Sequence, residues 1–178
     1  YVVTEAGFGA DLGAEKFLDI KCRYAGLHPA AVVLVATVRA LKSHGGVAKP
    51  DLGKPNAEAV RAGSVNLARH IENLQGFGLP VCVAINAFPA DTAEEMDVIY
   101  DVCNKAGVPC ALSEVFAKGG EGGKALAETV LSILDDSAEV QYTYELDAPL
   151  TDKIEAVATK IYRAGRVSYT AAAKKALD

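Results

Sequence analysis

The chain has 178 residues, of which 51% are hydrophobic and 23% charged, so it can bury the core of one α/β domain or a large part of one. Its formal net charge of -5 argues against a general nucleic-acid surface, because phosphate backbones are bound by clustered Lys and Arg. No apolar run reaches the roughly 18–20 residues of a membrane helix. We therefore expect a cytoplasmic protein that binds neither nucleic acid nor membrane. The opening residues carry no Met and no signal-peptide pattern, and they predict that the sequence begins within a strand of a longer protein.

Cysteine and histidine give no sign of a metal centre. No Cys-x-x-Cys spacing occurs, and no group of His, Cys, Asp and Glu has the spacing of a ligand set. We interpret the cysteines as buried free thiols in a reducing compartment. A metal site or a disulfide framework is the alternative. The cysteines are Cys22, Cys82, Cys103 and Cys110.

Apolar runs of strand length alternate along the chain with amphipathic stretches of helix length. Residues 30–36, a β-branched run, are typical of a strand covered on both faces. Asn56 is suited to cap a long helix, and Asp91 or Thr92 a later one. In chain order, the predicted elements are a strand end at 1–4, a helix at 13–24, a strand at 30–36, a surface loop at 44–55, a helix at 56–75, a strand at 81–86, a helix at 91–106, a strand at 108–112, a helix at 124–134, an edge strand at 141–146 and a helix at 149–163.

This alternation predicts an α/β fold with a mostly parallel sheet flanked by helices on both faces. Residues 1–140 are predicted to belong to the main α/β domain, and residues 141–178 to a C-terminal peripheral extension that starts a further domain. In parallel sheets, ligands bind beyond the carboxyl ends of the strands. The loops at those ends are residues 5–11, 37–46, 86–91 and 113–123.

Two aromatic residues stand in those loops. Phe88 follows the strand at 81–86, and Phe116 follows the strand at 108–112. Phenyl rings on neighbouring strand-end loops are able to clamp a flat ring, and stacking contributes roughly 1–3 kcal/mol per ring by analogy with nucleic-acid bases. The alternative is that both side chains belong to the core.

Glycine and charge mark the other loops. The segment 5–11 places two glycines around an aromatic, which lets a backbone approach a ligand closely or simply makes a tight turn. Residues 119–123 are a flexible lid, an amide nest at a helix start or a bare turn. Asn86 followed by Asp91 does not have the spacing of a GTPase base-recognition loop, and Asp91 is more simply part of a helix N-terminus. Three basic residues follow the strand at 30–36. They either face phosphate or a folate glutamate tail, or lie on a solvated helix face. They are Arg39, Lys42 and His44.

Four separated segments, in this order along the chain, resemble formate–tetrahydrofolate ligases (10-formyltetrahydrofolate synthetases). They are Thr4–Gly13 (TEAGFGADLG), Val35–Gly46 (VATVRALKSHGG), Asn86–Thr92 (NAFPADT) and Lys118–Gly123 (KGGEGG). The resemblance covers essentially the whole chain, and four matches in order are more specific than any one glycine-rich loop.

The resemblance implies an enzyme of one-carbon metabolism that joins formate to the N10 nitrogen of tetrahydrofolate and cleaves ATP to ADP and phosphate, by way of formyl phosphate. It also implies a fold like that of P-loop NTPases, a homotetramer, ATP with magnesium and tetrahydrofolate as substrates, and no covalently bound cofactor. The family's phosphate-binding loop lies upstream of the matching segments, and no Gly-x-x-x-x-Gly-Lys-Ser/Thr occurs in these 178 residues. We therefore expect this chain alone to be inactive.

The resemblance also assigns roles to particular positions. Phe88 and Phe116 match the aromatics that sandwich the pterin, where the adenine of ATP sits earlier in the cycle, and Trp is the residue expected at position 116. Leu112 is assigned to the same stacking site, and Asn86 and Arg39 are secondary candidates. Residues that contact formate are expected upstream, so no catalytic residue is assigned here. The loop expected to border the nucleotide and formyl phosphate contains Glu5, Gly7, Phe8, Gly9 and Asp11.

A second interpretation is a stand-alone α/β module that binds a nucleotide or a pterin without catalysis. An upstream phosphate-loop lysine in the same reading frame favours the enzyme. A native start just before Tyr1 favours the module.

Overall fold

The computed structural model describes residues 1–177, and the chain forms two compact units. The larger unit is the continuous stretch Pro29–Ala138. The smaller unit joins Tyr1–His28 to the stretch that begins at Glu139. The domain boundary predicted near residue 140 stays a prediction.

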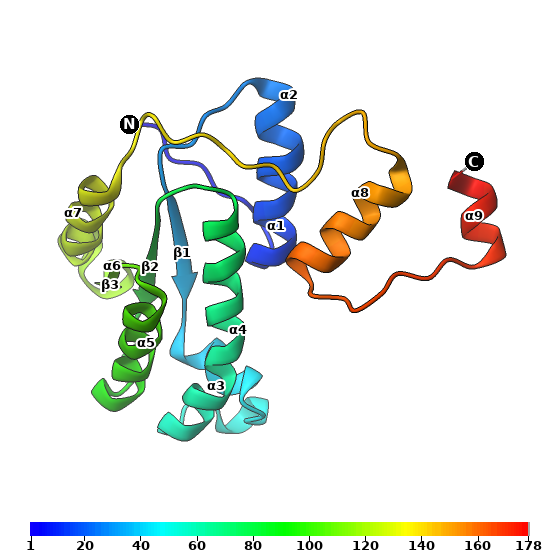
Figure 1. The fold of residues 1–178 in the computed structure, drawn as a ribbon. Coiled ribbons are helices and arrows are strands. Elements are labelled where there is room, and N and C mark those ends of the chain that lie inside the picture. Colours follow the sequence, from blue (N-terminus) through cyan, green and yellow to red (C-terminus); the bar gives the residue numbers. More distant parts are fainter. Residues whose placement is uncertain (178) are drawn as a thin grey trace. The chain divides into compact units, whose positions relative to one another are not determined.

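The larger unit is built around a three-stranded parallel sheet in the order β1-β2-β3 (Figure 1). Val32 of β1 pairs with Val81 of β2, and Val83 of β2 pairs with Cys110 of β3, so the three carboxyl ends point to one edge. The three strands predicted from apolar runs, and their parallel direction, are confirmed. The strands are β1 (Val32–Ala36), β2 (Val81–Asn86) and β3 (Cys110–Ser113).

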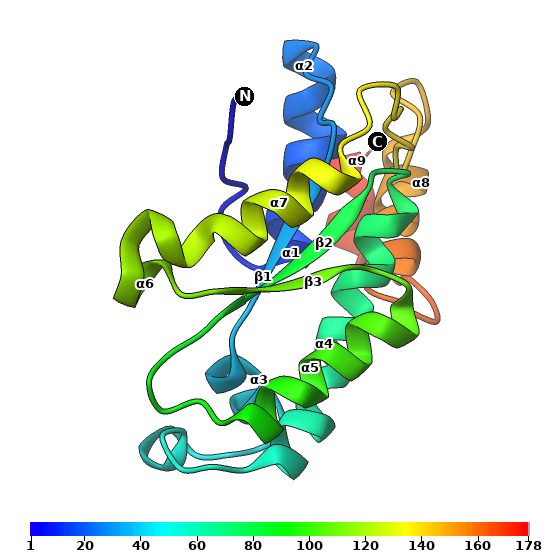
Figure 2. The same cartoon turned by 90° about the vertical axis from the view of Figure 1, so that its left-hand side faces the viewer.

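Helices cover both faces of this sheet, with α4 and α5 on one face and α7 over β2 and β3 on the other (Figure 2). The predicted long helices at 56–75 and 91–106 are confirmed as α4 and α5. The predicted loop at 37–46 instead holds α3, because the side chain of Thr37 caps it by accepting the N–H of Ala40 at 3.1 Å. The helices of this unit are α3 (Val38–His44), α4 (Ala57–Gly76), α5 (Ala93–Ala106), α6 (Val115–Lys118) and α7 (Lys124–Ile133), with 3₁₀ turns at Lys49–Asp51 and Gly119–Gly123.

One face of β1 is less covered than its sequence predicts. Leu34 and Ala36 are buried, but Val33 and Val35 on the opposite face are 39% and 62% exposed. β1 is an edge strand, and α7 lies mainly over the neighbouring strands β2 and β3 on that face. The expectation that residues 30–36 are covered on both faces is therefore wrong for this chain.

The smaller unit contains one long helix followed, much later in the sequence, by shorter ones. The predicted helices at 13–24 and 149–163 are confirmed. The long helix consists of α1 (Ala10–Lys16), a π-helical segment (Phe17–Cys22) and α2 (Arg23–Ala25). The later elements are α8 (Leu150–Ala156), its π-helical continuation (Val157–Ile161) and α9 (Ala171–Leu177).

Two predicted strands do not form in the smaller unit. Residues 1–4 pair with no strand, and Tyr1, Val2 and Val3 are each at least 95% exposed. Residues 141–146 alternate like an edge strand, but Thr143 donates its N–H to the carboxylate of Asp19 and accepts a hydrogen bond from Lys160. The N–H and the carbonyl oxygen of Thr143 are therefore hydrogen-bonded to side chains, so they do not form the backbone hydrogen bonds of a sheet.

A buried ion pair links several segments of the larger unit. Lys42 of α3 and Glu95 of α5 have side chains that are 1% and 0% exposed, and Nζ of Lys42 lies 2.9 Å from Oε1 of Glu95. Lys42 also donates to the carbonyl oxygen of Lys54 at 3.0 Å, and Glu95 accepts the backbone N–H of Asn56 at 2.8 Å. The carboxylate of Glu95 further accepts the N–H and the hydroxyl of Thr92, at 3.0 and 2.9 Å. One ion pair thus ties α3, the loop before α4 and the start of α5 together.

The same contacts decide the charge state of Glu95. Burial by itself raises the pKa of this carboxyl, but hydrogen bonds from Lys42, Asn56 and Thr92 outweigh burial and bring the pKa down to about 2. The expectation that Lys42 faces phosphate or a folate tail, or lies on a solvated face, is wrong, because its ammonium is buried against protein oxygens.

Lys42→Met removes the ammonium and leaves the carboxylate of Glu95 buried without its partner. We expect the free energy of unfolding to fall by about 3–5 kcal/mol, measured by denaturant titration. Adding Glu95→Gln removes the stranded charge and should recover part of the loss. Lys54→Met is the control, because it breaks an exposed pair with Asp51 whose side chains are 76% and 50% exposed, and it should change stability little. Equal losses for the two lysine variants would contradict the structural role of the buried pair.

A cluster of ionisable side chains holds the long helix of the smaller unit against a later segment. Asp19 is 1% exposed, and its Oδ1 accepts the N–H of Thr143 at 2.8 Å. The guanidinium of Arg23 lies 3.9 Å from the ring centroid of Tyr142. Burial raises the pKa of Glu15, one turn before Asp19, and the charge and hydrogen bond of Asp19 raise it further, to about 7. A protonated Glu15 supplies the donor that Oδ2 of Asp19 otherwise lacks among the described residues.

The raised pKa of Glu15 predicts a pH dependence for this unit. Because the folded state holds the proton more tightly than the unfolded chain, stability falls as the pH rises from about 5 to 8. Glu15→Gln carries no charge and keeps a donor, so it should remove most of that fall. The measurement is amide-exchange protection of residues 10–25 at both pH values. Glu58→Gln, whose parent side chain is 87% exposed on α4, should keep the wild-type dependence. Protection in the wild type that does not fall between the two pH values would contradict the assignment.

Candidate functional site

Phe88 and Phe116 come together at the carboxyl edge of the sheet. Asn86 pairs with Ser113, and the N–H of Ala87 donates to the carbonyl oxygen of Ser113 at 3.1 Å, so the two loops leave from hydrogen-bonded neighbours. The ring centroids are 6.4 Å apart and the ring planes are inclined by 41°. Phe88 is 41% exposed and Phe116 is 80% exposed, which is not the burial of core residues. The structure thus brings the two rings together as expected, and their role in binding stays a prediction.

The two rings touch each other instead of framing an open slot. Centroid distances of about 4.5–7 Å are those of direct aromatic pairs. A flat ligand stacked between two rings needs about 7 Å, because each stacked contact takes about 3.5 Å. The spacing of 6.4 Å is slightly short, and the tilt of 41° must decrease before both faces of a ligand can be covered. A bound ring would replace one Phe–Phe contact by two contacts of its own.

Thr92, not Asp91, caps the helix that follows Phe88. The side chain of Thr92 accepts the N–H of Glu95 at 3.3 Å, and the carboxylate of Glu95 accepts the N–H of Thr92, which is a capping box. The interpretation of Asp91 as the cap is therefore wrong. Its carboxylate turns back and accepts the N–H of Phe88 at 2.9 Å.

A glycine-rich turn shapes the Phe116 side of the pair. The N–H of Glu114 donates to the carbonyl oxygen of Gly122 at 3.0 Å, which brings the turn Gly119–Gly123 back to the start of α6. A Cβ on Gly122 would lie 2.5 Å from the carbonyl carbon and oxygen of Glu114, so a larger residue cannot fit without displacement. Residues 119–123 form a turn, and their use as a lid or an anion nest stays a prediction.

The other assigned residues of the larger unit lie near strand ends. Leu112 is half-buried on β3, and Asn86 is half-buried as the last residue of β2, so both share the sheet edge that carries the rings. Arg39 is exposed in the first turn of α3, directly after β1. His44 is exposed at the end of the same helix.

The loop assigned to the nucleotide and formyl phosphate belongs to the smaller unit. Phe8 has a φ of 68°, which is uncommon for a residue other than glycine. The loop lies against its own helix, because a Cβ on Gly13 would be 1.8 Å from the carbonyl oxygen of Gly7. Its place beside a nucleotide stays a prediction. Its assigned residues are Glu5, Gly7, Phe8 and Gly9, all exposed, and the half-buried Asp11.

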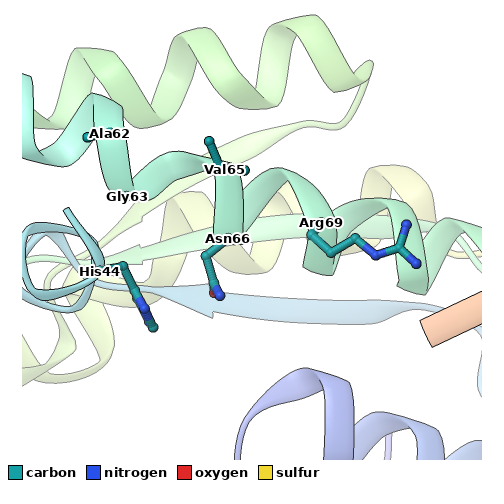
Figure 3. Close-up of a pocket in the computed structure, with 6 residues that line it drawn as sticks. All are labelled: His44, Ala62, Gly63, Val65, Asn66 and Arg69. Atoms are coloured by element: carbon teal, nitrogen blue, oxygen red, sulfur yellow. The ribbon is translucent and has the colours of Figure 1, made fainter. Parts of the chain in front are cut away.

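A separate pocket lies on α3 and α4 (Figure 3). The side chains of His44 and Asn66 extend in the same direction there, and Arg69 is ion-paired with Glu72 at 2.9 Å. None of the residues assigned to ring binding lines this pocket. Within residues 1–177, no group of three or more His, Cys, Asp or Glu side chains is placed to hold a metal ion, and no helix is long and apolar enough to cross a membrane. The lining residues are His44, Ala62, Gly63, Val65, Asn66 and Arg69.

Open parallel α/β sheets bind small molecules beyond the carboxyl ends of their strands, and Phe88 and Phe116 are exposed at that edge. Comparison with known proteins gives the family. The family model described as formate–tetrahydrofolate ligase matches residues 1–178. A formate–tetrahydrofolate ligase of Granulibacter bethesdensis is 55% identical over 179 residues, which cover 100% of this chain and 31% of the relative. The chain belongs to the formate–tetrahydrofolate ligase family, as its four segments predict, and it spans about a third of that relative's length.

Two residues beside the rings have local roles that sequence reasoning missed. Asp91 follows Phe88 by three positions with Pro89 between them, which is a turn pattern that could have indicated a side-chain bond to the backbone. Gly122 lies in a run with three other glycines, and the sequence alone does not tell which of them a close backbone contact requires.

Gly122→Ala should push the glycine-rich turn away from Glu114, because the new methyl group meets backbone atoms and not a side chain that can move aside. We expect a loss of about 1–3 kcal/mol in the free energy of unfolding, measured by denaturant titration. Gly120→Ala is the matched control, since a Cβ there has no neighbour within 4 Å, and its effect should be small. Equal effects of the two substitutions would show that the turn does not pack as described.

Proposed function

We propose that this chain is part of an ATP-dependent ligase that joins formate to tetrahydrofolate, and that it provides the surface that holds the flat ring of the folate. The family match along all 178 residues supports the reaction. The exposed contact between Phe88 and Phe116 at two neighbouring strand ends supports the ring-holding role, and it is the observation that carries the proposal.

The proposed reaction has two displacements. Formate attacks the γ-phosphate of ATP, which gives formyl phosphate and releases ADP. The N10 amine of tetrahydrofolate then attacks the formyl carbon, and phosphate leaves. In such phosphoryl-transfer chemistry a protein acts mainly by positioning reactants and stabilising charge. Phe88 and Phe116 carry neither a charge nor a transferable proton, so their part is to position the pterin. Adenine is also flat, so the same pair suits the base of ATP earlier in the cycle.

The rest of the machinery is proposed to lie outside this chain. The open edge of β1 and the exposed Val33 and Val35 suit a larger parallel sheet of the P-loop NTPase type. Among the described residues, no group of three or more His, Cys, Asp or Glu side chains is placed to hold a metal ion, and magnesium is proposed to enter with the ATP phosphates. With no phosphate-binding loop motif among its 178 residues, this chain by itself should not turn over ATP or formate. The complete enzyme is proposed to be a cytoplasmic homotetramer, as the family resemblance implies.

The stacking role is tested by folate binding to the full-length ligase that contains this segment. Phe88→Ala and Phe116→Ala should each raise the dissociation constant for tetrahydrofolate about tenfold or more, because each removes one stacked face. Phe116→Trp should hold or improve affinity, since the indole covers a larger area.

Tyr24→Ala is the control, because that aromatic is 96% exposed in the smaller unit and belongs to no assigned site. It should leave the affinity unchanged. Wild-type affinity in both phenylalanine variants would refute the stacking role.

A further inference from the structure

The ring of Phe88 is carried by a turn that two hydrogen bonds close. The N–H of Asp91 donates to the carbonyl oxygen of Phe88 at 2.9 Å, and the N–H of Phe88 donates to Oδ2 of Asp91 at 2.9 Å. Pro89 between them has a fixed φ and restricts the residue before it to extended conformations. Both backbone polar groups of Phe88 are thus bonded to one residue, Asp91.

This backbone restraint bears on where the ring stands. Phe88 is 41% exposed, and its ring lies against the tilted ring of Phe116. A side chain takes its direction from its backbone and its χ1 rotamer. A group that fixes the backbone of Phe88 therefore limits the positions open to the ring.

Asp91 is itself well placed to act as an anchor. The next residue, Thr92, caps α5 and is bonded to the carboxylate of Glu95 through both its N–H and its hydroxyl. Glu95 is in turn paired with the buried Lys42. The turn thus connects an exposed ring, within a few residues, to the hydrogen bonds and buried ion pair of Glu95.

We propose that Asp91 is a positioning residue for ring binding: its carboxylate holds the backbone of Phe88 so that the ring is already in place when a flat ligand arrives. The inference rests on the proposed function, because it concerns the same site. Ordering a loop on binding lowers affinity, and a loop that is ordered beforehand avoids this loss. Asp91 needs no contact with the ligand for this role.

A purely structural role for Asp91 is the competing explanation. A carboxylate just before a helix N-terminus interacts favourably with the helix dipole, and this effect depends on charge and not on the bond to Phe88. Three substitutions separate the two roles. Asp91→Ala removes both the charge and the acceptor. Asp91→Asn removes the charge and keeps an acceptor oxygen at the same distance. Asp91→Glu keeps the charge and moves the acceptor by one methylene group.

The test measures the dissociation constant for tetrahydrofolate in the full-length ligase. Asp91→Ala and Asp91→Glu should each raise it by roughly 2–10-fold, the range expected for the loss of one ordering hydrogen bond, and Asp91→Asn should stay within about twofold of the wild type. In the Phe88→Ala background, Asp91→Ala should add nothing, because the ring that it positions is gone.

Each outcome decides between the accounts. Wild-type affinity in Asp91→Ala, or a loss that persists undiminished in the Phe88→Ala background, overturns the positioning role. If Asp91→Asn strongly lowers the affinity for tetrahydrofolate and Asp91→Glu does not, Asp91 acts through its charge on the helix dipole. That result also overturns the positioning role. If Phe88→Ala itself leaves folate binding unchanged, it is the proposed function that fails, and the positioning role fails with it.

Discussion

The ammonium of Lys42 and the carboxylate of Glu95 meet inside the larger unit, 2.9 Å apart, and the position of the candidate site depends on this contact. Two charges are removed from water at a considerable cost, which is offset only when they meet each other and further polar groups in good geometry. Lys54 and Asn56 supply two of these groups from the loop before α4, and Thr92 supplies others from the start of α5. If α3, the loop before α4 and the start of α5 did not all reach these positions, a buried charge would lack a partner.

The site sits at one end of this network. Lys42 lies in the segment that follows β1, and Glu95 lies in the first turn of the helix that follows the Phe88 turn. A basic residue after a strand of a parallel α/β sheet invites a ligand-binding interpretation. In this chain, Lys42 instead stabilises the part of the fold that carries Phe88 and Phe116, which are both uncharged. The chain thus contributes the shape of a ring site, and the chemistry of phosphate transfer is proposed to come from elsewhere in the protein.

The sequence predicted the parts of the fold that local patterns decide. The apolar runs at 30–36 and 81–86 became parallel strands, and the cap at Asn56 marked the start of α4 correctly. The aromatic pair was also predictable, because Phe88 and Phe116 follow the ends of two consecutive strands, and consecutive parallel strands often lie side by side.

What the sequence did not predict depends on partners far away along the chain. Nothing near Lys42 indicates that its partner is Glu95. Residues 141–146 alternate like a strand, yet the distant Asp19 and the nearby Lys160 bind the backbone of Thr143 and leave no ladder to form. Val33 and Val35 follow a buried-strand pattern, yet both side chains are exposed in the part of the chain that the structure describes, residues 1–177. An apolar pattern in the sequence shows which side chains are able to be buried. The folded structure is needed to show which of them are buried.

The most direct test of the account is a crystal structure of the full-length ligase with tetrahydrofolate bound. We predict that the pterin lies between Phe88 and Phe116, that their ring centroids move apart from 6.4 Å to about 7 Å, and that the tilt of 41° closes toward parallel. We also predict that the hydrogen bond between Asp91 and Phe88 and the Lys42–Glu95 ion pair remain in place. A folate bound elsewhere, with the two phenylalanine rings still in contact with each other, would contradict it.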